Sequence, residues 1–224
     1  MSNVYIALIG DIIKSKNLEN RTDIQKRLTK TLKELNEEYA DVFASNLTVT
    51  LGDEFQGVFK NGKAVLEIVD KIKFLMSPVE FRFGIGIGEI ITEMKKEISI
   101  GADGPAYWNA RQAIKDIHST NDYELSRILV SNGLEGQPLK MINDSLALCD
   151  FIESRWRETQ RDLLTKSIEN YGHSQKVPQI ELAKLLGLSS QATNQRIQSS
   201  GYYQYLRMKT TIAQELEVLR EGIK

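Results

Sequence analysis

The feature that most constrains the fold of this chain is a run of three glycines at alternate positions in an apolar segment. Residues 81–91 read Phe-Arg-Phe-Gly-Ile-Gly-Ile-Gly-Glu-Ile-Ile, in which Gly84, Gly86 and Gly88 alternate with apolar residues. Successive side chains of a strand point to opposite faces, so these glycines leave one face of a strand without side chains. We therefore expect close packing against that backbone, at a subunit or ligand surface. The spacing does not fit a dinucleotide-binding fingerprint, because no helix follows the glycines at once.

The segments around this strand predict a mixed α+β domain. Short apolar runs rich in β-branched residues indicate strands, and apolar residues recurring every three or four positions indicate helices. The expected order is strand, helix, two strands, helix, strand, helix, strand, over Val4–Ile9, Asn20–Tyr39, Leu47–Leu51, Phe55–Phe59, Lys63–Met76, Phe81–Ile91, Gly104–Ser119 and Leu125–Val130. This order predicts an antiparallel sheet covered by helices in a ferredoxin-like arrangement.

The character of the sequence changes after the turn-rich stretch Ser131–Asp144, from which point helical patterns replace strands. One apolar stripe between Ser145 and Tyr171 predicts a single long helix that Gly172 ends. We place the domain boundary in the turn-rich stretch. The prediction is an α+β domain over residues 1–138 and an all-α domain over residues 139–224.

Two short helices within Val177–Tyr203 predict a helix-turn-helix module. Gly187 ends the first helix, Ser189 caps the start of the second, and Gly201 ends it, while Ala183 is small where the two helices cross. The alternative is an ordinary helical hairpin that packs on the rest of the protein. An outward face rich in amides favours DNA binding, because amides pair with adenine in the major groove. The expected DNA-binding residues are Ser190, Gln191, Asn194, Gln195, Arg196 and Gln198.

Charge permits DNA binding without arguing strongly for it. The whole chain carries a net charge of -1, and the part from residue 150 onward holds eleven basic and nine acidic residues. One short helix presents little surface for tight binding by a monomer, so we expect a homodimer. The helices over Ser145–Tyr171 and Tyr203–Leu219 are the candidate dimer elements.

Two glycine-flanked aspartates predict a metal or phosphate site in the first domain. Asp11 follows the first strand in Gly10-Asp11, and Asp53 lies at the hairpin turn in Gly52-Asp53. Carboxylates at the ends of neighbouring strands supply the hard oxygen ligands that Mg²⁺ prefers. The alternative is that both aspartates serve only as turn residues.

The order of these motifs resembles the class III nucleotide cyclase homology domain over about residues 3–130. The resemblance is carried by Gly10-Asp11-Ile12, Gly52-Asp53, Arg82–Glu89 and Asn109-Ala110-Arg111, and the hairpin also resembles that of diguanylate cyclases. It implies that Asp11 and Asp53 bind Mg²⁺ and that Arg111 stabilises the phosphates. If the domain is an enzyme, Arg111 and Asn109 are the candidate catalytic residues.

Two departures from the cyclase pattern favour ligand binding over cyclisation. The purine-selecting lysine is missing from Asn46–Thr50, and Tyr107 stands where the family has its asparagine, so that Asn109 comes two residues late. Two positions rotate a helical side chain by roughly 200°. We expect a domain degenerate for catalysis that senses a nucleotide or another phosphorylated ligand, or that only dimerises.

Five stretches carry a resemblance that spans nearly the full chain: Ile9–Ser15, Leu51–Gly57, Arg82–Glu89, Gly101–Arg111 and Arg155–Gln160. Taken whole, the chain is similar to the SatD family, which implies a bacterial DNA-binding protein. The expected function is a transcriptional regulator with a cyclase-like sensor or dimerisation domain. The alternative is an Mg²⁺-dependent nucleotide cyclase or nucleotidyl-transfer enzyme with a helix-turn-helix output, so the sequence leaves open whether the chain is an enzyme.

The remaining features point to the cytoplasm. Cys149 is the only cysteine, which excludes an internal disulfide and fits a reducing compartment. The apolar run Val4–Ile9 is too short for a signal peptide core or a membrane span, so we expect no membrane partner. His118 and His173 have no cysteine pair near them in the sequence, which argues against zinc.

Overall fold

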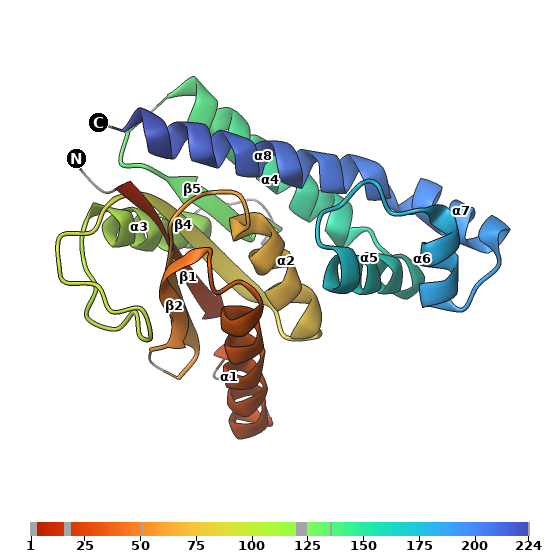
Figure 1. Ribbon diagram of the computed structural model, residues 1–224, viewed down its shortest axis with the longest axis horizontal. Helices are drawn as coiled ribbons and strands as arrows, with labels where there is room; N and C mark the ends of the chain where they lie inside the picture. Colours follow the sequence, from red (N-terminus) through yellow and green to blue (C-terminus); the bar gives the residue numbers. More distant parts are fainter. Residues whose placement is uncertain (1–3, 16–18, 51, 120–124, 135, 224) are drawn as a thin grey trace.

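The computed structural model describes residues 4–15, 19–50, 52–119, 125–134 and 136–223. These residues form one five-stranded sheet and eight helices, which confirms a mixed α+β fold (Figure 1). The strands are β1 (Val4–Ile12), β2 (Phe43–Val49), β3 (Glu54–Phe59), β4 (Phe81–Glu89) and β5 (Ile128–Ser131). The helices are α1 (Arg21–Glu38), α2 (Val65–Leu75), α3 (Pro105–Ser119), α4 (Gln137–Ser154), α5 (Glu158–Tyr171), α6 (Gln179–Leu186), α7 (Ser190–Ser200) and α8 (Tyr202–Gly222).

The strand order in the sheet is β2-β3-β1-β4-β5. The first four strands pair antiparallel, whereas β5 runs parallel to β4. The expectation of a wholly antiparallel sheet is therefore wrong for β5. The reason is its connection, since α3 crosses one face of the sheet and returns the chain in the direction of β4. Leu51, the expected last residue of the first hairpin strand, lies outside the described residues.

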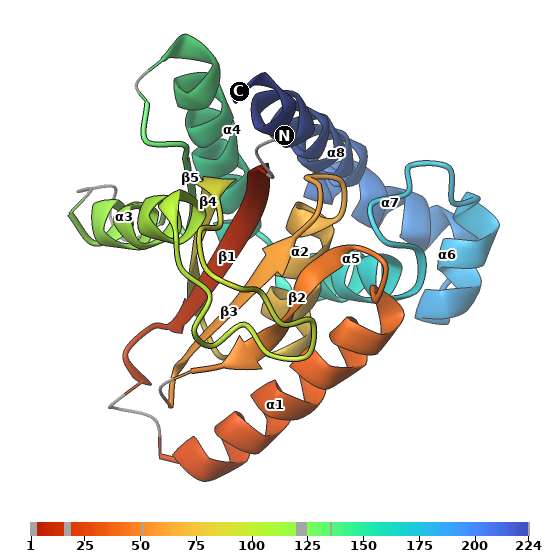
Figure 2. The same cartoon turned by 60° about the vertical axis from the view of Figure 1, so that its left-hand side comes forward.

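The glycine face of β4 is covered by α3 (Figure 2). A Cβ atom added to Gly86 would lie 2.0 Å from the carbonyl oxygen of Ala106, and one added to Gly84 would lie 2.2 Å from that of Ala110. Only a backbone without side chains allows this approach. The expectation of close packing is confirmed, and the element that packs there is a helix of the same chain.

The opposite face of the sheet carries the large apolar side chains, such as Phe55 and Phe83, and α1 and α2 cover it. The same core includes Ile142 and Leu146 from α4, and Ile212 and Leu216 from α8. These four residues all follow the expected boundary at residue 138, so segments from both sides of that boundary share this core.

The expected single helix over Ser145–Tyr171 is wrong, because the chain breaks between α4 and α5. Trp156 lies at the break and is buried, with its ring centroid 4.9 Å from that of Tyr205 and its Nε1 donating to the carbonyl of Ser200 at 2.8 Å. Gln160 accepts a hydrogen bond from the backbone N–H of Arg157 and so caps the new helix. Burial of the indole against α8 thus overrides the helical pattern.

A second apolar cluster holds α5, α6, α7 and the start of α8 together at the end of the molecule away from β1 (Figure 1). The turn between α6 and α7 is as expected: Gly187 has φ 65° and ψ 35°, a left-handed conformation that favours glycine. The Ser189 hydroxyl accepts from the backbone N–H of Ala192 at 3.2 Å. No described helix is long and apolar enough to cross a membrane.

Candidate functional site

Three charged residues lie side by side at one end of the sheet. Asp11 on β1 is paired in register with Glu54 on β3 and with Arg82 on β4. The alternation of side chains along β1 places Asp11 on the same face as Ala7 and Ile9, which is the face that α3 covers. We call Glu54, Asp11 and Arg82 the strand-end row.

Helix α3 adds two cationic or ionisable side chains above the strand-end row. Arg111 Nη1 lies 3.5 Å from a carboxylate oxygen of Glu54, and His118 Nε2 lies 4.0 Å from one of Asp11. Arg82 Nη1 lies 3.7 Å from the same Asp11 oxygen. About half of each side chain of Arg111 and His118 is exposed, so both can reach a ligand from solvent.

The structure brings Asp53 close to Asp11, as expected. The backbone N–H of Ile12 donates to the Asp53 carbonyl at 3.1 Å, and the Ser15 hydroxyl donates to the Asp53 carboxylate. Burial raises the pKa of Asp11 above its ordinary value, and the Asp53 carboxylate raises it further. Arg82 and His118 act in the opposite direction without cancelling the rise. The charged form of Asp11 is thus disfavoured, first by burial and then by a neighbouring carboxylate, and a bound cation would favour it.

The donors at this site fit Mg²⁺ held jointly with a ligand. Among the described residues, no group of three His, Cys, Asp or Glu side chains can hold a metal ion by itself. Mg²⁺ usually needs only one or two carboxylates, with water and ligand phosphates completing its shell. Asp11 and Asp53 would provide these carboxylates, while Arg82 and Arg111 offer N–H donors to phosphate oxygens.

The structure separates Asn109 from Arg111. The Asn109 amide donates to the carbonyl of Ile87 at 2.9 Å and faces Gly133, toward β5, whereas Arg111 faces β3. Tyr107, which stands where the cyclase pattern has an asparagine, is buried. Its hydroxyl makes no hydrogen bond to a described residue, although Ser99 lies nearby, and burial raises the pKa of Tyr107 well above its ordinary value.

The expected DNA-binding residues form a second candidate surface, on α7. Thr193 and Ile197 face inward and are buried, which turns the opposite side of the helix to solvent. Arg196 differs from the rest of the set, because its guanidinium lies 3.5 Å from Asp162 on α5 and is only partly exposed. The exposed residues on this face are Ser190, Gln191, Asn194, Gln195 and Gln198.

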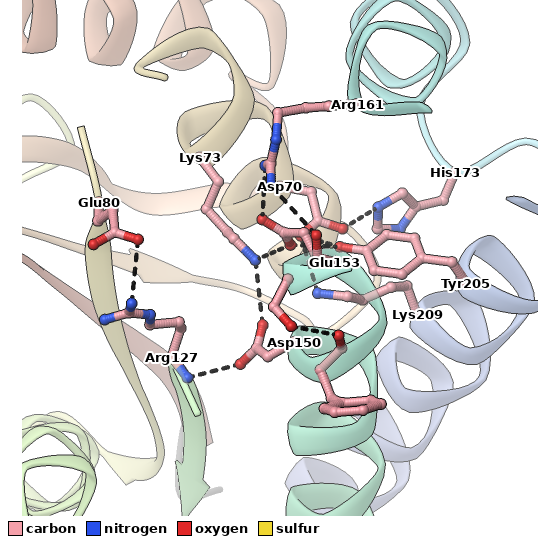
Figure 3. Close-up of polar contacts among 12 residues, drawn as sticks. Asp70, Lys73, Glu80, Arg127, Asp150, Glu153, Arg161, His173, Tyr205 and Lys209 are labelled. Carbon is pink, nitrogen blue, oxygen red and sulfur yellow. Dashed lines mark hydrogen bonds and ion pairs between the residues drawn. The ribbon is translucent and has the colours of Figure 1, made fainter. Parts of the chain in front are cut away.

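A cluster of charges that the sequence analysis missed joins the sheet to the helical end (Figure 3). We call it the junction cluster. At its centre Asp70 on α2 is fully buried, with Lys209 Nζ at 2.9 Å, His173 Nε2 at 3.0 Å and the Tyr205 hydroxyl at 3.1 Å. Its members come from α2, α4, α8 and the segment after α5: Asp70, Lys73, Asp150, Glu153, His173, Tyr205 and Lys209.

The junction cluster holds its central charges by mutual pairing. Burial alone would raise the pKa of Asp70, but Lys209, His173 and Lys73 outweigh it and hold that pKa well below the ordinary value. Burial alone would lower the pKa of Lys73, but Glu153, Asp150 and Asp70 raise it well above its ordinary value. Both groups therefore remain charged inside the protein.

One sequence signal could have revealed part of the junction cluster. Lys209 follows Tyr205 by four residues and precedes Ile212 by three, so it lies on the apolar stripe of its helix. A lysine in that position requires a buried acidic partner. The partner itself, Asp70, is 139 residues away in the sequence, and no local pattern identifies it.

Comparison with known proteins identifies a family for nearly the whole chain. The family model described as SatD family matches residues 5–216. No curated protein matches the chain. The chain belongs to the SatD family.

Proposed function

We propose that this member of the SatD family is a DNA-binding transcriptional regulator, in which α6 and α7 form a helix-turn-helix and α7 enters the major groove. The observation that carries the proposal is the exposed amide face of α7, with Gln191, Asn194, Gln195 and Gln198 turned to solvent. A solvated helix face carries charged side chains more often than amides, and amides pair bidentately with adenine.

In this proposal, residues 1–138 form the sensing or dimerisation domain and residues 139–224 form the output domain. The order β2-β3-β1-β4 with α1 and α2 on one face supports a ferredoxin-like, cyclase-like arrangement for the first domain. Helices α4 and α8 attach the output helices to the sheet core. One short reading helix gives weak binding alone, so the active form is a homodimer, which analytical ultracentrifugation would test.

Gel-shift assays with DNA from the genomic neighbourhood of the gene test the proposal. Because Gln195 is exposed, Gln195→Ala removes base contacts and weakens specific binding by about 1–3 kcal/mol without loss of fold. Arg196→Ala has a smaller effect on specificity, because Arg196 is engaged with Asp162.

The matched control is Gln214→Ala, which removes an exposed amide from α8 and leaves binding unchanged. The salt concentration must be stated, because phosphate contacts dominate affinity. Absence of any retarded DNA at low salt would show that the proposal is wrong.

A second candidate function rests on the strand-end row. Asp11 and Asp53 with Arg82 and Arg111 combine metal-binding oxygens and phosphate donors, which supports an Mg²⁺-dependent nucleotide-binding or nucleotidyl-transfer site. Tyr107 stands where nucleotide cyclases have an asparagine, and this substitution favours nucleotide binding without turnover.

Two measurements separate these outcomes. Calorimetric titration with ATP and GTP in Mg²⁺ should give saturable heat that Asp53→Ala abolishes. Prolonged incubation with ATP or GTP and Mg²⁺ or Mn²⁺ should leave the nucleotides unchanged. Formation of a cyclic product would instead show that the protein is a nucleotide cyclase. Absence of any heat of binding would show that the sheet domain does not bind these nucleotides and has a structural role.

A further inference from the structure

A cleft of about 400 Å³ opens beside the junction cluster. It lies between the segment that joins α2 to β4, the residues just before β5, the end of α4 and the start of α5. Its volume is within the range of small-molecule sites. Phe81 lines the cleft, whereas the next residue, Arg82, points to the opposite face of the sheet and into the strand-end row. The cleft is therefore a separate site from the one proposed above. Its charged lining residues are Lys73, Glu80, Arg127, Asp150, Glu153 and Arg161.

The two buried acids of the cleft are already satisfied by the protein. Asp150 accepts from Lys73 Nζ at 3.3 Å and from the backbone N–H of Arg127 at 2.7 Å. Glu153 accepts from Lys73 Nζ at 2.5 Å and from Arg161 Nη1 at 3.3 Å. Since these carboxylates have partners within the chain, a bound cation would have to break existing pairs.

The two guanidinium groups, in contrast, keep donors to spare. A guanidinium carries five N–H donors. Among the described residues, the side chain of Arg127 hydrogen-bonds one acceptor, Glu80, and Arg161 hydrogen-bonds only Glu153, through its carboxylate and its backbone carbonyl. The side chain of Arg127 is 19% exposed and that of Arg161 is 35% exposed, so both are accessible from the cleft.

Glu80 shows how an anion would sit on Arg127. Its carboxylate lies 3.2 Å from Arg127 Nη2, yet its side chain is 63% exposed (Figure 3). An exposed ion pair of this kind contributes about 0–1 kcal/mol, so an incoming anion can displace it. The Glu80 carboxylate thus occupies the position that a ligand anion would take on Arg127, and it is weakly bound there.

We propose that this cleft binds a small organic anion through a carboxylate or phosphate group, with Arg127 and Arg161 as the donors and Glu80 as an internal competitor. Guanidinium groups suit both anions, because their parallel N–H bonds match two oxygens at once. The volume of the cleft accommodates a metabolite and excludes a macromolecule. The inference does not depend on DNA binding or on the strand-end row.

Isothermal titration calorimetry with inorganic phosphate and with succinate, at constant ionic strength, tests the site. These probes are small representatives of the two anion classes, and saturable heat with either supports the proposal and identifies the class. Glu80→Gln should tighten binding, since it removes the competing carboxylate. Loss of a charge-assisted donor in Arg127→Ala or Arg161→Ala should weaken it roughly ten-fold or more.

Three further variants make the result specific. Arg155→Ala is the matched control, because Arg155 lies over the Phe151 ring, does not line the cleft, and should leave binding unchanged. Arg111→Ala should also leave it unchanged, which separates this site from the strand-end row. Arg127→Lys keeps the charge and loses the paired donors, so it should weaken binding even if Arg161→Ala fails to fold.

Two results would overturn the proposal. One is the absence of saturable heat with both anions in the wild-type protein and in Glu80→Gln. The other is binding that persists at full strength in the folded Arg127→Ala and Arg127→Lys variants.

Discussion

The junction cluster and the strand-end row both combine acidic and basic side chains, but they differ in burial and in how completely the acids are paired. In both, acids and bases from distant elements converge. In the junction cluster Asp70 is fully buried, and a lysine, a histidine and a tyrosine satisfy it. In the strand-end row the Asp11 side chain is 25% exposed, and its neighbours include two further acids as well as Arg82.

This difference in burial and pairing distinguishes a cluster that stabilises the fold from a cluster that can bind a ligand. A buried charge whose partners are complete holds elements together and has nothing left for a ligand. A partly exposed carboxylate beside other carboxylates is destabilised in the absence of a cation. Burial and the completeness of pairing, rather than residue type, therefore indicate which of two charged clusters binds a ligand.

The largest expected effect comes from breaking the junction cluster. Asp70→Ala leaves Lys209 buried without its carboxylate partner, and we expect the free energy of unfolding to fall by about 3–5 kcal/mol. Urea denaturation at neutral pH measures this change.

The double variant Asp70→Leu with Lys209→Met serves as the control, because it removes both charges and should recover much of the loss. If Asp70→Ala destabilised the protein no more than Asp11→Ala does, the contrast between the two clusters would be wrong.

A smaller effect should follow from displacing the helix above the strand-end row. Gly86→Ala places a methyl group against the backbone of Ala106, so α3 must move. We expect a loss of about 1–3 kcal/mol in the free energy of unfolding, the usual range for overpacking.

Gly222→Ala is the matched control, because a Cβ at that position meets nothing within 4 Å. Equal unfolding midpoints for the two variants would contradict the close contact between α3 and β4. Weaker nucleotide binding by a folded Gly86→Ala variant would show that α3 positions Arg111 and His118.

The smallest expected effects are changes in the free energy of unfolding with pH, and they test the comparison of the two clusters most directly. The lowered pKa of Asp70 means that its pairing stabilises the fold above the ordinary pKa of 3.8 and is lost as pH falls toward the folded-state value. The raised pKa of Asp11 gives the free energy of unfolding the opposite dependence on pH. Its contribution is fully present below 3.8 and is lost as pH rises through the folded-state value.

Urea denaturation from acid to neutral pH should therefore show two opposite trends. The deficit of Asp70→Asn relative to wild type should grow as pH rises from strongly acidic conditions. Asp11→Asn should improve relative to wild type as pH rises, by less than about 1 kcal/mol because the site is partly exposed. Trends of the same sign in both variants would remove the distinction between the clusters.

Much of the local structure could be predicted because its causes are local. The alternate glycines of β4 fit only a strand with a closely packed face, and Gly187 and Ser189 mark a helix end and a helix start. The inward positions of Thr193 and Ile197 determine which side of α7 faces solvent. The proximity of Asp11 and Asp53 also followed, because adjacent strands of a hairpin sheet bring their ends together.

The errors arose where distant contacts decided the outcome. The direction of β5 depends on the path of α3 over the sheet, and the break before α5 depends on Trp156 packing against Tyr205. The contact of Arg196 with Asp162 on α5 is another one that the local sequence does not predict. The junction cluster has no local signature beyond Lys209.

The sequence by itself determined the α+β class, the order of the elements as far as β5, the membership of a family and the amide-rich face of α7. These properties depend on side-chain periodicity and on backbone preferences within a few residues. Only the tertiary structure decided which charges are buried together, such as Asp70 with Lys209, and which remain accessible, such as Asp11 and Arg127. The reason is that burial and electrostatic pairing depend on distances in space, which the packing of the helices on the sheet sets.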